Sequence, residues 1–239
     1  MEKAPAGTGI RRGWARVGPI GLALVLVCST WTGVAAAAPG GPVALGNADG
    51  FAVMAAATIT NTGPSTITGN IGLSPGTAIT GLTSITLNGT VHAADPVAAQ
   101  AQNDLTAAYN DAAGRTPDAI NPGDIGGTTL TPGVYKSASS LGLTGTVTLN
   151  GQGNPNAVFI FQIGSTLITA SASHVALTGG TQASNVFWQV GSSATLGTYS
   201  ALAGTIMALA SITVTTGVTL DGRALARTAA VTLDTDTIG

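Results

Sequence analysis

An apolar residue, a threonine and a second apolar residue follow one another repeatedly in the second half of the chain. The pattern occurs at four places, with a looser copy at a fifth. The five segments are Val147-Thr148-Leu149, Ser165-Thr166-Leu167 (the looser copy), Ala194-Thr195-Leu196, Ile212-Thr213-Val214 and Val231-Thr232-Leu233. Because alternate residues of a β-strand point to opposite faces, each segment predicts a short strand with its threonine turned outward.

The spacing of these segments predicts how the strands stack. The sequence numbers of Thr148 and Thr166 differ by 18, as do those of Thr195 and Thr213, and Thr232 follows Thr213 at a spacing of 19. The longer spacing of 29 between Thr166 and Thr195 fits one coil that carries an insertion of about 11 residues. Short fixed periods with several strands in each are typical of a β-solenoid, whose coils pack one on the next. We therefore expect the five threonines to form one outward column.

One segment interrupts the β pattern and predicts a helix over residues 95–114. Asp95 fits the N-cap, Pro96 fits the first helical position, and apolar residues then recur near helical spacing until Gly114. β-like, Thr-rich sequence lies on both sides of this amphipathic segment. The simplest arrangement is one domain built from two pieces, with the helix packed along one flat side of the solenoid.

The beginning of the chain has the layout of a secretory signal peptide. Basic residues precede an apolar run from Ile20 to Cys28, and small residues follow from Val34 to Ala38. The apolar run is shorter than the roughly 20 residues that span a bilayer. We expect residues 1–38 to be removed and residues 39–239 to form a single domain that is secreted into the extracellular medium.

Removal of this segment changes the charge balance. Four basic and nine acidic residues remain, which is a net charge of −5, and Cys28 is the only cysteine of the chain. A nucleic acid or an anionic membrane surface requires basic clusters, so neither is expected as a partner after signal cleavage. Without disulfides, the stability of the protein must come from packing. We expect a monomer.

Six longer segments add a resemblance to this picture. They are LGNADGFAVMAAATITNTGPSTITGNIGLSPGTAITG (45–81), DLTAAYNDAAGRTPD (104–118), LTPGVY (130–135), VFIFQIGSTL (158–167), SNVFWQVGSSATLGT (184–198) and DGRALARTAAVTLD (221–234). In content and order they resemble the microbial ice-binding proteins. The resemblance implies a mostly β fold: a right-handed discontinuous β-solenoid of triangular cross-section with one long α-helix packed along one side. It also implies a flat ice-binding face on another side.

An ice crystal surface is therefore the expected partner, and rows of threonine are the candidate contact. Each threonine offers a methyl group that orders neighbouring water and a hydroxyl that can anchor that water. A second set of candidates comes from a short family-like motif, in which Thr, Ala or Gly, any residue and Thr follow one another. The candidate ice-binding residues from both sets are Thr148, Thr166, Thr195, Thr213, Thr232, Thr216, Thr219, Thr77, Thr80, Thr178 and Thr181. Periodicity leaves open which side of the triangle meets ice.

No motif indicates catalysis, a metal site or a cofactor. His92 and His174 are far apart and belong to no metal-ligand spacing. After the signal peptide there is no glutamate, and Lys136 is the only lysine, which argues against a polysaccharide-cleaving β-helix enzyme. The predicted function is a secreted ice-binding protein that gives thermal hysteresis, ice recrystallisation inhibition or both. The alternative is a cell-surface adhesin or structural β-solenoid module without ice activity.

Overall fold

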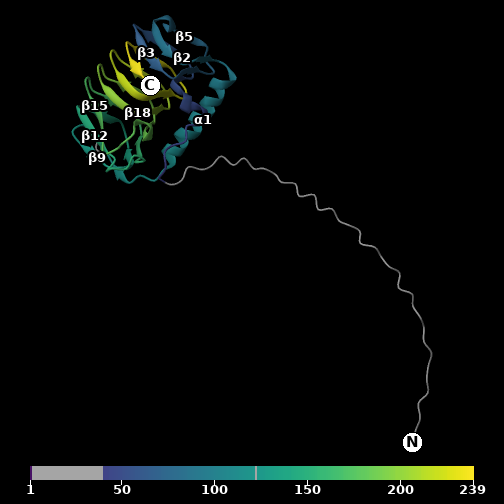
Figure 1. Cartoon of the computed structure of the whole chain (residues 1–239), viewed down its shortest axis with the longest axis vertical. Coiled ribbons are helices and arrows are strands. Elements are labelled where there is room, and N and C mark those ends of the chain that lie inside the picture. Colours follow the sequence, from purple (N-terminus) through teal and green to yellow (C-terminus); the bar gives the residue numbers. More distant parts are fainter. Residues whose placement is uncertain (2–39, 122) are drawn as a thin grey trace. The chain divides into compact units, whose positions relative to one another are not determined.

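The computed structural model describes Met1, residues 40–121 and residues 123–239. The expected signal peptide, residues 1–38, lies outside the described residues apart from Met1. From residue 40 onward the chain winds short β-strands into stacked coils, with one helix beside them (Figure 1). Neighbouring strands are parallel, as a solenoid requires. The predicted mostly β solenoid with a flanking α-helix is confirmed.

Each coil contributes strands to three sides of the stack, and along each side the strands follow one another in a fixed spatial order. The first side is a seven-stranded sheet of β11 (Leu141–Leu143), β14 (Leu167–Thr169), β17 (Ala194–Leu196), β19 (Ile212–Val214), β21 (Val231–Asp234), β2 (Thr58–Thr62) and β5 (Ala78–Thr80). The second side consists of β9 (Thr129–Leu130), β12 (Thr146–Asn150), β15 (His174–Thr178), the beginnings of β18 (Ala201–Ala208) and β20 (Thr219–Ala226), β22 (Thr237–Ile238), β3 (Ser65–Thr68) and β6 (Ile85–Asn88). The third side consists of β8 (Ala119–Ile120), β10 (Gly133–Ser137), β13 (Phe159–Ile163), β16 (Val186–Val190), the ends of β18 and β20, β1 (Phe51–Ala55), β4 (Asn70–Leu73) and β7 (Val91–Ala93).

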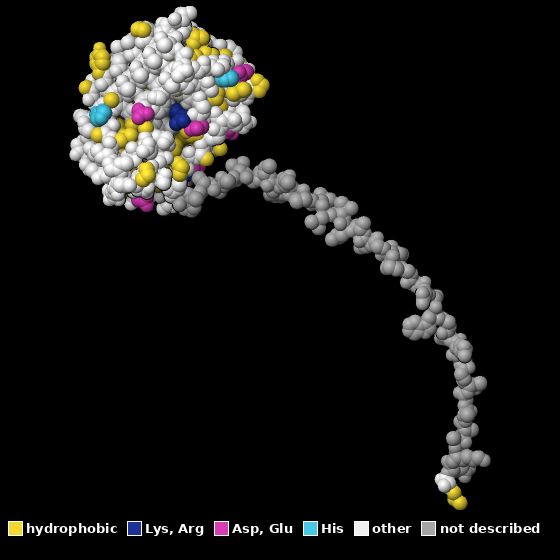
Figure 2. Space-filling view, viewed as in Figure 1, with side chains coloured by type: hydrophobic (Ala, Val, Ile, Leu, Met, Phe, Trp, Pro, Cys, Tyr) yellow, Lys and Arg dark blue, Asp and Glu magenta, His cyan; other side chains and the backbone are white. Residues whose placement is uncertain are grey.

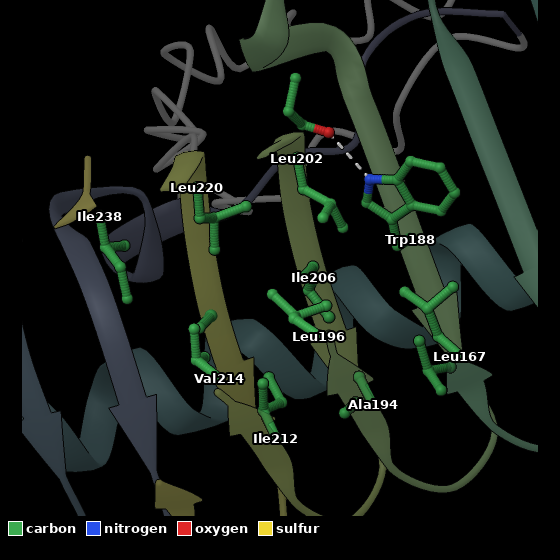
Figure 3. Packing of buried hydrophobic residues seen from close by; sticks show 14 of the residues in the cluster. Leu167, Trp188, Ala194, Leu196, Leu202, Ile206, Ile212, Val214, Leu220 and Ile238 are labelled. Atoms are coloured by element: carbon green, nitrogen blue, oxygen red, sulfur yellow. Dashed lines mark hydrogen bonds between the residues drawn. The ribbon is translucent and has the colours of Figure 1, made fainter. Parts of the chain in front are cut away.

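The interior of the stack is apolar because alternate residues of most strands point inward. On the first side Ala194 and Leu196, and Ile212 and Val214, are fully buried and meet side chains from the other sides (Figure 3). Aromatic residues concentrate behind the third side, where the ring of Trp188 stacks on that of Phe161 at a centroid distance of 4.1 Å. This packing supplies the stability that the absence of disulfides demands.

The helix α1 (Pro96–Gly114) covers the third side. Its N-cap Asp95 accepts a hydrogen bond from the backbone N–H of Ala98 at 2.8 Å, and Pro96 occupies the first turn. The buried face of the helix is mostly alanine and packs on outward side chains such as Phe187 and Met207. Small side chains let the helix lie close to the sheet. Two sides therefore remain uncovered by this helix.

The stacking order differs from the chain order at one place, which makes the solenoid discontinuous. The last coil of the chain pairs with the first: β21 pairs with β2, β22 with β3 and β20 with β1. Short 3-10 helices complete the elements of the described residues; they span Gly46–Gly50, Leu82–Ser84 and Ala183–Asn185. The strands before the helix and those after it form one stack, joined at a seam between the C-terminal coil and residues 51–68.

A buried polar network crosses this seam. The carboxylate of Asp236 accepts hydrogen bonds from the backbone N–H groups of Val218 (3.1 Å) and Asp234 (2.7 Å). The backbone N–H of Asp236 donates to Ser65 Oγ at 3.0 Å, and Ser65 Oγ donates to Asn61 Oδ1 at 2.7 Å. Burial raises the pKa of Asp236 to about 7, and the nearby charge of Asp234 adds to the increase.

This pKa predicts a pH dependence of stability. Folded Asp236 holds its proton up to a pH of about 7, whereas the unfolded chain releases it near pH 4, so folding takes up a proton between these values. The free energy of unfolding should therefore fall by on the order of 2–4 kcal/mol as the pH rises from 4 to 7. Chemical denaturation at several pH values measures this slope. It should vanish in Asp236→Asn and persist in Asp221→Asn, where an exposed carboxylate is removed instead.

The corner between the first and second sides uses left-handed backbone in successive coils. The residues concerned, with positive φ, are Gly145, Ala172, Tyr199, Gly217 and Thr235. At Gly217 the requirement for glycine is also steric, because a Cβ there would lie 2.5 Å from the ring of Tyr199 in the next coil. Gly217→Ala should therefore lower the free energy of unfolding by roughly 1–3 kcal/mol. Thermal denaturation tests this, and the penalty should shrink in a Tyr199→Ala background, where the clash is gone and only backbone strain remains.

Candidate functional site

The outer surface of the first side carries an aligned column of threonines. The strand register pairs Thr195 with Thr213, Thr213 with Thr232, Thr232 with Thr60 and Thr60 with Thr80. Four of the five lie at outward positions between buried residues, Thr80 follows the half-buried Ile79, and each of the five is exposed or half-buried. Residues of adjacent strands are about 4.8 Å apart, so the column is a straight row of equivalent side chains. We call it the central column.

A second column of small, neutral residues runs beside the central one, two residues earlier in each strand. From one end of the stack to the other it contains Ser140, Thr166, Ser193, Ser211, Ala230, Thr58 and Ala78. Hydroxyls of neighbouring coils contact each other in it: Ser140 with Thr166 at 2.7 Å, and Ser193 with Ser211 at 3.0 Å. The two columns together are called the Thr–Ser array. None of the described residues that form these columns carries a charge.

Three hydroxyls at the middle of the array are free to bind water. Within the described part of the chain, Thr195, Thr213 and Thr232 make no side-chain hydrogen bond, whereas Thr80 Oγ1 approaches Thr60 Oγ1 at 3.3 Å. Threonine is β-branched and stiff at χ1, and the strands hold its Cα atoms in register. The array is therefore ordered before any ligand arrives, which reduces the entropy lost on binding.

The second side presents a less regular surface. Its outward column contains four threonines in register, Thr219, Thr237, Thr66 and Thr86. Along the stack this column continues through Ala201 to His174, and the exposed Asp221 lies in the neighbouring column. Figure 2 shows scattered charged and histidine side chains on an otherwise largely uncharged surface. A charged group holds its own hydration shell, which makes this side the poorer template for ordered water.

Two members of the predicted column lie elsewhere. Thr148 is in β12 on the second side, where it pairs with Thr129 and Ala176. Thr166 lies on the first side but in the flanking column, because Ile168 and not Thr166 pairs with Thr195. The prediction of five threonines in one column was thus wrong for these two residues, and that column did not include Thr60 or Thr80.

The motif-derived candidates are scattered over several parts of the fold. Thr80 belongs to the central column, whereas Thr77 lies exposed before β5. Thr219 is on the second side, and Thr216 is at the corner, where its hydroxyl bonds to Asp234 Oδ2. Thr178 ends β15 on the second side, and Thr181 is buried and donates to the carbonyl of Leu149 at 3.0 Å. The motif therefore does not define one surface.

Charged residues do gather in one hollow, of about 610 Å³, at the C-terminal end of α1. Arg115 there is bound to Asp111 at 2.7 Å and to backbone carbonyls, and Asp118 accepts the backbone N–H of Val134 at 2.8 Å. Each of these charged side chains thus binds another side chain or the backbone and stabilises the fold locally. His92 likewise contacts Asp95 at 2.8 Å beside the helix start. Among the described residues no group of three potential metal ligands occurs, and no helix is long and apolar enough for a membrane span.

Comparison with known proteins gives a consistent result. The family model described as "Ice-binding-like" matches residues 53–239. An ice-binding protein of Nostoc sp. (strain HG1) is 54% identical over 196 residues, which cover 81% of this chain and 72% of the relative. An ice-binding protein of Colwellia sp. is 42% identical over 216 residues, which cover 82% of this chain and 83% of the relative. The crystal structure of an ice-binding protein from an Antarctic biological consortium matches with a TM-score of 0.81 at 52% identity, covering 82% of this chain and 90% of the other.

Proposed function

The chain belongs to the ice-binding-like family, and on that premise we propose that it adsorbs to ice through the Thr–Ser array of the first side. Family membership also confirms the prediction of a non-enzymatic protein. One observation carries the choice of side: five threonines stand in unbroken register, Thr195 to Thr80, on a surface whose two columns carry no charge among the described residues.

The geometry of the array explains how it could hold water in an ice-like arrangement. Rows repeat at about 4.8 Å along the stack, and positions within a strand repeat at roughly 6.5–7 Å. Methyl groups order the water between rows, and each free hydroxyl fixes one water by a hydrogen bond. A sheet of water held in this way can merge with the growing crystal, so that the protein becomes anchored and the surface between anchored molecules stops advancing.

The cellular part of the proposal follows from the beginning of the sequence. Residues 1–38 have the layout of a secretory signal, and we propose that the protein acts outside the cell as a monomer. There it would give thermal hysteresis, inhibit ice recrystallisation, or both. Neither a nucleic acid nor a membrane is proposed as a partner, because the net charge of residues 39–239 is −5.

A cold-stage microscope tests this function against the adhesin alternative. A single ice crystal held in a micromolar solution of the purified protein should develop facets and should stop growing within a measurable temperature interval below its melting point. Recrystallisation of a frozen sucrose solution should slow at the same concentration. With an adhesin or a purely structural module, the crystal would stay round and the ice grains would coarsen as fast as in buffer without protein.

A further inference from the structure

An isoleucine interrupts the array at one end. Ile168 occupies the place in the central column next to Thr195, with which it pairs in register. Its side chain is 52% exposed. Beyond it the column continues through Gly142, which has no side chain to offer, to Asp124, which pairs with Gly142 in the following coil. The unbroken threonines thus begin at Thr195 and extend in one direction only, toward the coils of residues 51–93.

Burial does not explain why an isoleucine lies outward here. In β14 the polar Thr169 is the buried residue, 3% exposed, and its Oγ1 accepts the backbone N–H of Gly197 at 2.8 Å. The apolar Ile168 faces solvent beside it. A slip of one residue would bury Ile168 but turn the fully buried Leu167 out, so the strand is fixed in this register. An outward isoleucine between inward Leu167 and Thr169 reverses the usual pattern, and such exceptions are the informative ones.

The chemistry of this side chain differs from threonine in two respects. Isoleucine has the same branched Cβ and a methyl group, so its shape at the base of the array is similar. It has no hydroxyl to anchor a water molecule, and its ethyl arm extends one carbon beyond the plane that the threonines define. The water layer ordered by Thr195 and Thr213 therefore reaches a longer side chain at Ile168. This side chain displaces the water outward and offers no hydroxyl to bind it.

We propose that Ile168 sets the limit of the ice-binding array at this end of the stack. The inference rests on the proposed function of the first side. A threonine at this position would extend the central column from five members to six, from about 19 Å to about 24 Å in length. It would also lie two residues from Thr166, which belongs to the second column and contacts Ser140. The strand β14 would then present two outward threonines, as β2 does with Thr58 and Thr60.

The test is a gain of activity in Ile168→Thr. Thermal hysteresis at equal concentration should rise by roughly one quarter or more, the proportion by which the column lengthens. Ile168→Val is the matched control: it removes the protruding carbon but adds no hydroxyl, and should give less than half of that gain. A second control, Ala201→Thr, lengthens the threonine column of the second side and should leave the hysteresis unchanged. Thermal denaturation should show all three variants folded, because the substituted side chains lie at outward positions.

Thr213→Tyr, measured in the same series, separates the inference about Ile168 from the proposed ice-binding function of the first side. If Thr213→Tyr loses activity but Ile168→Thr gains none, the limit at Ile168 is wrong and the array stands. An equal gain from Ile168→Val would also overturn the inference, because the missing hydroxyl would then be irrelevant. If Thr213→Tyr keeps full activity, the proposed function of the first side itself fails.

Discussion

Thr213→Tyr should abolish most of the thermal hysteresis without unfolding the protein. Thr213 is the second of five threonines in the central column, and its hydroxyl is free to bind water. A tyrosine ring there would stand several ångströms above its neighbours and hold the crystal away from Thr195 and Thr232 at once. We expect hysteresis to fall by roughly tenfold at equal concentration, because residues at the centre of an interface carry most of its binding energy. Nanolitre osmometry measures this.

The matched control is Thr237→Tyr, which places the same ring in the threonine column of the second side. Both variants alter an outward strand position, so both should stay within about 0.5 kcal/mol of the parent in unfolding free energy. Loss of activity in the control with retention in Thr213→Tyr would move the ice-binding surface to the second side. Equal loss in both would mean that the two uncovered sides act together, contrary to the proposal.

Trp188→Ala should produce the largest loss of stability. Trp188 is fully buried, its ring stacks on Phe161 at 4.1 Å, and its Nε1 donates to the carbonyl of Ala203 at 3.0 Å (Figure 3). Removal of a buried aromatic residue costs about 3–5 kcal/mol. For a domain of this size each kcal/mol lowers Tm by roughly 2–4 °C, so Tm should fall by about 6–20 °C in calorimetry.

Trp188→Phe separates packing from hydrogen bonding. It keeps a ring to stack on Phe161 but leaves the carbonyl of Ala203 without its donor, which should cost about 1–3 kcal/mol. Trp188→Ala should therefore be the more damaging by a clear margin. A loss below about 1 kcal/mol in Trp188→Ala, within the range of ordinary substitutions, would show that the aromatic residues behind the third side do not hold the coils together.

The sequence predicted those parts of the fold in which coils follow one another without insertions. Thr195, Thr213 and Thr232 recur at spacings of 18 and 19, and the structure places them in register. The helix was also predictable, because Asp95 and Pro96 are local signals that need no tertiary information. Local pattern and global fold agree in these segments.

The wrong placement of Thr148 and Thr166 in the predicted threonine column has one physical cause. Leu141 pairs with Leu167, and Leu167 pairs with Ala194, at spacings of 26 and 27, so two coils are long and not one. The extra residues form the loops at 151–158 and 179–185 on the way to the third side. The spacing between Thr148 and Thr166 matches the period only by coincidence, since these residues lie on different sides. A period alone does not show where within a coil an insertion lies.

Thr60 could not be found from spacing at all. It lies next to Thr232 because the N-terminal piece stacks on the last coil of the chain, and this contact joins segments from opposite ends of the domain. No sequence period crosses such a seam. What fixes the seam is complementarity of buried groups, including Asp236 with Ser65, and that complementarity becomes visible only in three dimensions.

The most direct measurement is the uptake of fluorescently labelled protein into a single ice crystal grown slowly from dilute solution. The parent protein should be taken up on discrete crystal planes, and so should a Thr66→Tyr/Thr237→Tyr double variant of the second side. A Thr60→Tyr/Thr195→Tyr double variant of the first side should be excluded from the ice. Uptake of the first-side variant equal to that of the parent would contradict the proposal, because the Thr–Ser array would then not be the surface that meets the crystal.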